Sequence, residues 1–67
     1  MATWYVQQDG TGEYGYELRG GKLYYIERDK DTNSSSEEEV GVDEFLKHYG
    51  SDSQEPYPQI IAALKAL

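Results

Sequence analysis

Three stretches of the first half of the chain, residues 3–8, 13–19 and 22–28, are rich in apolar, β-branched and aromatic residues. Apolar and polar positions alternate over residues 13–19, whereas residues 3–6 and 23–26 are continuous runs of such residues. Stretches of this composition and length are typical of β-strands, and the short Gly-containing segments between them are typical of hairpin turns. The pattern therefore predicts a three-stranded antiparallel meander.

The two turns predict the register of the strands. Gly20-Gly21 suits a two-residue primed turn, because both central residues of such a turn favour glycine. The pairs expected from it are Leu18 with Leu23, Tyr16 with Tyr25, and Glu13 with Arg28. Residues 9–12 suit a type I turn with Gly12 in the left-handed conformation of a G1 bulge. The pairs expected from this turn are Val6 with Tyr16 and Trp4 with Leu18.

Both registers place one set of large side chains on the same face of the sheet. This set consists of Trp4, Val6, Tyr14, Tyr16, Leu18, Leu23 and Tyr25. The opposite face carries Tyr5, Glu17, Tyr24 and Ile26, with a gap at Gly15. A shift of one residue in either hairpin would mix the two sets, so we expect one core face and one face that is partly exposed to water.

The second half of the chain begins with a stretch that has no apolar residue, and after it the apolar residues recur at the spacing of an α-helix. Residues 29–39 (DKDTNSSSEEE) predict a flexible acidic and polar linker, although residues 38–42 could add a short fourth strand. Two apolar stripes at helical spacing follow: Val42, Phe45, Leu46 and Tyr49, and then Tyr57, Ile60, Ile61, Leu64 and Leu67. Asp43 is the expected N-cap of the first helix, and Gly50 lies just past its end.

The fold predicted from these elements is a single α+β domain over residues 1–67, with two short helices packed on one face of the meander. Its expected core consists of Trp4, Tyr16, Leu18, Tyr25, Phe45, Ile61 and Leu64. Leu, Ile, Val and Phe make up only 12 of the 67 residues, which together with a net charge of -7 is typical of disordered chains. Seven Tyr and one Trp supply the missing apolar area, so we expect disorder to be local.

The composition also limits the cellular compartment and the class of partner that we expect. The chain has no Cys, no apolar run of membrane-spanning length and no basic leader, and we expect a cytoplasmic protein without disulfides. Residues 34–67 hold seven Asp and Glu against two Lys, a net charge of -5. Since phosphate backbones are bound by Lys and Arg, this charge argues against direct nucleic-acid binding and favours a basic protein surface as partner.

Four local patterns suggest chemistry, and each has a simpler structural interpretation. Residues 10–15 match G-x-G-x-x-G and resemble the glycine-rich hairpin of protein kinases, but here the motif joins two strands, which indicates turn glycines. Residues 29–35 alternate oxygen ligands as an EF-hand loop does, but Ser34 replaces the required Gly and Val40 the required Glu. Ser34–Ser36 precede three Glu and resemble an acidophilic kinase site, and a solvated acidic loop is the simpler interpretation. His48 is the only His, too few for a zinc site or a catalytic triad.

The function predicted from the sequence is that of a small, non-catalytic protein-binding module: a regulator, inhibitor or accessory subunit. One form of it is mimicry of nucleic acid by carboxylates, as in small acidic inhibitors from phage or mobile elements. The alternatives are a structural homo-oligomer and, more remotely, calcium binding through residues 29–39. We expect no cofactor, no metal and no catalytic residue. The expected partner-binding residues are Tyr5, Tyr24, Ile26, Glu37, Glu38, Glu39, Asp43 and Glu44.

Overall fold

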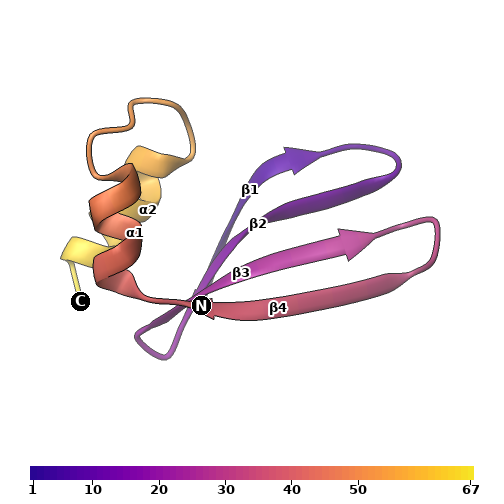
Figure 1. Ribbon diagram of the computed structural model, residues 1–67, viewed down its shortest axis with the longest axis horizontal. Helices are drawn as coiled ribbons and strands as arrows, with labels where there is room; N and C mark the ends of the chain where they lie inside the picture. Colours follow the sequence, from indigo (N-terminus) through magenta and orange to yellow (C-terminus); the bar gives the residue numbers. More distant parts are fainter.

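The computed structural model describes residues 1–67 and contains four antiparallel strands followed by two helices (Figure 1). The strands are β1 (Ala2–Gln8), β2 (Gly12–Arg19), β3 (Lys22–Asp29) and β4 (Ser34–Val40), and the helices are α1 (Val42–Tyr49) and α2 (Tyr57–Lys65). The strands lie in the sheet in the order β1-β2-β3-β4. The predicted α+β class and antiparallel meander are confirmed, and the fourth strand that residues 38–42 could add is present but spans Ser34–Val40.

The hairpin between β2 and β3 forms in the predicted register. Gly20 and Gly21 both have positive φ, 59° and 78°, which a primed turn requires and which residues with a Cβ adopt at a cost. The strand pairs that this turn predicts are all present: Leu18 with Leu23, Tyr16 with Tyr25, and Glu13 with Arg28. A turn defined by its own two residues therefore sets the register of the central strands.

The turn between β1 and β2 differs from the prediction. Gly12 does not have positive φ. Instead, the backbone N–H of Asp9 donates to the Gly12 carbonyl at 2.9 Å, and one Asp9 carboxylate oxygen accepts from the backbone N–H groups of Thr11 and Gly12 at 2.9 and 3.1 Å. These hydrogen bonds hold the turn without a left-handed residue. The same carboxylate oxygen accepts from the Thr11 hydroxyl at 2.8 Å, and this hydrogen bond is the largest cause that holds the pKa of Asp9 well below its usual range, with the backbone N–H groups adding to it.

The predicted register of β1 is also wrong, although its faces are right. A β-bulge lies between Tyr5 and Gln7, so that Val6 is an extra residue, and Trp4 pairs with Tyr16 rather than with Leu18. The shift at Trp4 is two residues, which preserves the face that each side chain occupies. Trp4 and Val6 accordingly pack against the core as expected.

The linker expected over residues 29–39 is replaced by a turn and a strand. Residues 30–33 form the turn, in which Asn33 has a φ of 55°, and Ser34–Val40 form β4, paired with β3 along its whole length. β4 is an edge strand whose Ser and Glu side chains are exposed, so it has no hydrophobic alternation to reveal it. Backbone hydrogen bonds to β3 and the pairing of Val40 with Leu23 hold it in register.

The core joins residues of the sheet and of both helices. Its buried members are Tyr16, Leu23, Phe45, Ile60, Ile61 and Leu64, and Trp4, Leu18 and Tyr25 are partly buried against them. All seven predicted core residues thus belong to the core or pack on it. At the helix ends two expectations fail: α1 is preceded by Gly41 rather than capped by Asp43, and Leu67 lies beyond the end of α2 with 67% of its surface exposed.

The helices and the loops of the outer hairpins lie at opposite ends of the sheet (Figure 1). α1 follows directly on β4 and lies beside α2, whereas the β1–β2 and β3–β4 loops project away from them. Lys30 joins these two loops: its backbone N–H donates to the Thr11 carbonyl, and its ammonium donates to the Asp9 carbonyl, both at 2.9 Å. With eight and nine residues, α1 and α2 are too short to cross a membrane.

Candidate functional site

The sheet has a second face, opposite to the side chains of the core, that brings together groups from all four strands. Because successive side chains point to opposite sides of a strand, the neighbours of the core residues Tyr16 and Leu23 belong to this face, which we call the outer face. Its cross-strand rows are Thr3, Glu17, Tyr24 and Glu39; Tyr5, Gly15, Ile26 and Glu37; and Glu13, Arg28 and Ser35. Five of the eight predicted partner-binding residues lie in these rows.

Tyr5 and Ile26 form the apolar centre of the outer face, on either side of Gly15. A Cβ at Gly15 would collide with the Trp4 carbonyl oxygen, so β1 and β2 approach each other closely only because this residue is glycine. Tyr5 is 40% exposed and Ile26 is half-buried. A shallow hollow lies beside them, and Glu37 also lines it. The face therefore presents an apolar area to solvent at its middle.

The phenol of Tyr5 is linked to an acidic neighbour. Interaction of its hydroxyl with the Glu13 carboxylate raises the pKa of Tyr5, and the same interaction is the largest cause that lowers the pKa of Glu13. Glu13 also lies 3.4 Å from the ammonium of Lys30. Tyr5 is therefore a neutral donor and Glu13 a charged acceptor at neutral pH.

Arg19, at the end of β2, lies over the ring of Tyr24 on the outer face. Its guanidinium carbon is 4.3 Å from the ring centroid. Its Nε lies 3.3 Å from a Glu17 carboxylate oxygen, and its Nη2 donates to Glu37 at 2.9 Å. The hydrogen bond with Glu37 is the largest cause that raises the pKa of Arg19. One cation is thus held by an aromatic ring and two carboxylates from three strands.

The structure divides the acidic residues that the sequence grouped together. Glu37 and Glu39 lie on the outer face, where they pair with Ile26 and Tyr24. Glu38 points to the other side of β4, opposite Tyr25. Asp43 and Glu44 are exposed in the first turn of α1, where negative charge is favourable next to the positive end of the helix dipole. These three residues do not belong to the outer face.

Three charged residues of β2 that lie on the outer face were missing from the predicted partner-binding set: Glu13, Glu17 and Arg19. Alternation along β2 was a sufficient signal for all three, since Tyr14, Tyr16 and Leu18 point to the core side and the residues next to them must point away. The contact between Arg19 and Glu37 had no such signal. It joins β2 to β4 across β3, and it exists only because β4 completes the sheet.

The candidate calcium and histidine positions are engaged in local structure. One Asp29 carboxylate oxygen accepts from the backbone N–H groups of Asp31 and Thr32 at 2.9 and 3.4 Å, which shapes the β3–β4 turn. His48 is exposed on α1, with its ring 4.5 Å from that of Tyr49. No group of three or more His, Cys, Asp or Glu side chains is arranged to hold a metal ion.

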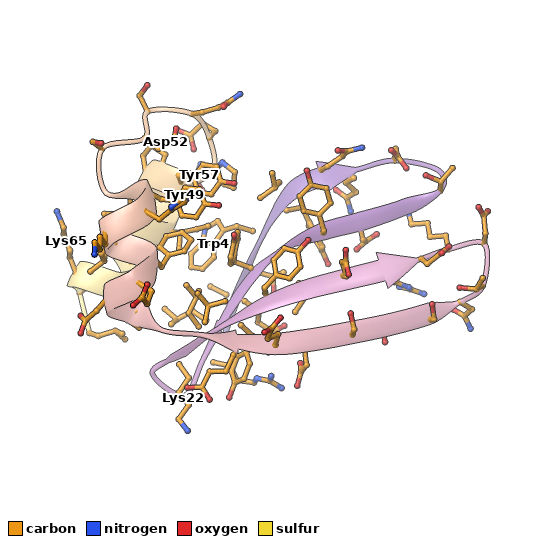
Figure 2. The ribbon with its side chains drawn as sticks, viewed as in Figure 1. Trp4, Lys22, Tyr49, Asp52, Tyr57 and Lys65 are labelled. Carbon is orange, nitrogen blue, oxygen red and sulfur yellow. The ribbon has the colours of Figure 1, made fainter.

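The aromatic residues on the core side pack against one another. Tyr49 and Tyr57 stack with ring centroids 4.3 Å apart and planes within 6° of parallel, and Figure 2 shows both beside Trp4, between the helices and the sheet. Burial is the largest cause that raises the pKa of Tyr57 to about 12. We interpret these rings as the edge of the hydrophobic core.

The chain matches no protein-family model, no curated protein and no solved structure.

Proposed function

We propose that this protein is a non-catalytic binding module whose outer sheet face engages a basic surface of a partner protein. The observation that carries the proposal is the register of β4, which pairs Glu37 with Ile26 and Glu39 with Tyr24. Exposed carboxylates thereby flank an apolar centre on one face. The aromatic sheet face that the sequence suggested thereby gains two carboxylates, Glu37 and Glu39, from the acidic strip that the sequence suggested separately.

The proposal takes both helices to pack on the opposite face of the sheet, at the end distant from the β1–β2 and β3–β4 loops (Figure 1). In its support, Phe45 of α1 and Ile60 of α2 belong to one buried cluster with Tyr16 and Leu23. Tyr16 and Leu23 point away from the outer face. In this arrangement the helices leave the outer face open along its whole length.

The groups on the outer face have the properties of a protein interface. Interfaces combine an aromatic and apolar centre with a polar rim, and tyrosine is enriched at the positions that contribute most affinity. Tyr5, Tyr24 and Ile26 supply the centre here, and Glu13, Glu37 and Glu39 supply the rim. The net charge of -7 would raise the association rate with a basic partner.

A capture experiment with matched charge variants tests the proposal. The immobilised protein would be compared with Glu37→Lys/Glu39→Lys, which changes the outer face, and with Glu38→Lys/Glu55→Lys, which changes net charge equally elsewhere. We expect basic proteins, identified by mass spectrometry, to be retained by the original protein and the control but not by the outer-face variant. Retention of the same proteins by all three would contradict the proposal.

Association and dissociation rates with a captured partner separate long-range electrostatic attraction from direct contacts in the interface. Both double variants should lower the association rate, because long-range attraction depends on charge beyond the contact area and is screened over about 8 Å at physiological salt. Only the outer-face variant and Tyr24→Ala should also raise the dissociation rate. Size-exclusion chromatography with light scattering tests the homo-oligomer alternative, for which the protein would elute as a dimer or larger without any partner.

A further inference from the structure

The contacts of Arg19 form a site that fits a guanidinium group. The guanidinium carbon of Arg19 lies over the ring of Tyr24, 4.3 Å from its centroid. Carboxylate oxygens of Glu17 and Glu37 lie 3.3 Å from the Nε of Arg19 and 2.9 Å from its Nη2. A planar cation that stacks on an aromatic ring and donates hydrogen bonds along its edge uses all of these contacts. An ammonium group is compact and strongly hydrated, and it cannot stack and pair in this way.

We propose that Tyr24, Glu37 and Glu39 form a binding position for an arginine of the partner, and that Arg19 fills this position in the free protein. The inference rests on the proposed function and names the chemistry that the outer face recognises. Arg19 is then an internal competitor, which leaves the ring when the partner's arginine arrives.

Arg19 is held weakly enough to be displaced. Its side chain is 43% exposed and that of Glu37 is 53% exposed, and ion pairs between such exposed groups contribute little to stability. Arg19 is also the last residue of β2, next to the turn at Gly20 and Gly21, so its side chain can turn toward solvent without disturbing the core. The competitor can therefore leave without unfolding the protein.

Glu39 gives an incoming arginine a contact that Arg19 does not use. It lies directly opposite Tyr24 in the sheet and forms no ion pair, whereas Glu17 and Glu37 are both occupied by Arg19. Its carboxylate is exposed. An arginine that approaches from solvent can stack on Tyr24 and pair with Glu39 as well as Glu37, which favours it over Arg19.

An NMR titration with two defined peptides tests the inference. Hexa-arginine and hexa-lysine carry the same charge and differ in the cationic group. We expect hexa-arginine to bind about two- to fivefold more tightly, the factor that an exposed cation–π contact supplies. Hexa-arginine should also shift the Arg19 side-chain Nε–H signal toward its value in a free chain, as the Tyr24 ring current is lost, whereas hexa-lysine should leave it largely in place.

Variants separate recognition from net charge. Arg19→Ala removes the competitor and should strengthen hexa-arginine binding by about two- to fivefold. Lys22→Ala makes the same change in charge at the neighbouring turn and should affect both peptides slightly and equally. Tyr24→Phe keeps an aromatic ring and should preserve the preference for arginine, whereas Tyr24→Leu should abolish it. Amide spectra of each variant would verify that the sheet remains folded.

The outcomes distinguish this inference from the proposed function. If both peptides shift the amides of Glu37 and Glu39 and bind equally, the outer face binds basic groups but the arginine site is wrong. An Arg19 signal that does not move on saturation with hexa-arginine would equally overturn it. If neither peptide shifts the outer-face signals, the proposed function and the inference both fail.

Discussion

Replacement of Phe45 by Ala tests whether one core joins the helices to the sheet. Phe45 is 2% exposed, and its ring centroid lies 5.1 Å from that of Tyr16 and 4.8 Å from that of Tyr49. Truncation of a buried Phe to Ala removes these contacts and leaves a cavity, at a cost of about 3–5 kcal/mol. The ring packs edge-on against Tyr16 of the sheet and at a tilt against Tyr49 of its own helix, and rigid aromatic neighbours on both sides can move little into the space.

This loss is large relative to the stability of so small a domain. At about 0.05–0.15 kcal/mol per residue, a chain of 67 residues has a free energy of unfolding of about 3–10 kcal/mol. α1 has only eight residues and no side-chain cap, and helices of this length are not stable in isolation. We therefore expect Phe45→Ala to unfold α1, and much of the domain, at 25 °C.

Urea denaturation, followed by far-UV circular dichroism and by the fluorescence of Trp4, measures the effect. Ile60→Val should cost about 0.5–1.5 kcal/mol, small enough to leave a complete unfolding transition if Phe45→Ala does not fold. Lys47→Ala, at an exposed position on α1, is the control and should lie within about 0.5 kcal/mol of the original protein. The reasoning would be refuted if Phe45→Ala unfolds cooperatively and its free energy of unfolding is less than about 1 kcal/mol below that of the original protein.

Three further predictions concern the sheet, alkaline pH and calcium. Gly15→Ala should lower the melting temperature strongly because its Cβ would meet the Trp4 carbonyl, whereas Gly10→Ala, with no atom within 4 Å of the added Cβ, should change it little. Burial raises the pKa of Tyr57 from 10.0 to about 12. The contribution of the neutral phenol to stability is therefore complete below pH 10 and is lost as the pH rises toward 12. Tyr57→Phe should consequently lose less stability than the original protein between pH 10 and 12, as measured by circular dichroism. Millimolar calcium should leave the melting temperature unchanged, because Asp29 already accepts hydrogen bonds from its own turn; a saturable rise would contradict this.

The parts of the fold that were predictable depend on neighbours in the sequence. Gly20-Gly21 specifies its turn through the φ angles that glycine allows, and the register of β2 and β3 follows from that turn. The spacing of Phe45 and of Ile60 and Ile61 likewise predicts one buried stripe on each helix, and these residues are buried. In each case the information lies within a few residues of the element that it determines.

The bulge at Val6 and the greater part of β4, before Glu38, had no such local signal. The bulge reflects how β1 fits against β2, where Gly15 lets the two backbones approach. β4 lacks hydrophobic alternation because, as an edge strand, it is exposed on both faces, and it is held by β3. An edge strand gains its stability from backbone hydrogen bonds to its neighbour, which leave no trace in its own composition.

The candidate site shows the same division. The sequence by itself determined that Tyr24 and Ile26 share a face, because alternation along β3 decides it. Tyr5 lies on the same face because the shift in the register of β1 at Trp4 is two residues, which preserves the faces. Only the tertiary structure decided that Glu37 and Glu39 join that face while Glu38 points away, and that Arg19 lies between Tyr24 and Glu37. The physical reason is that these contacts connect strands far apart in the sequence, and their geometry exists only once β3 has aligned β4 beside it.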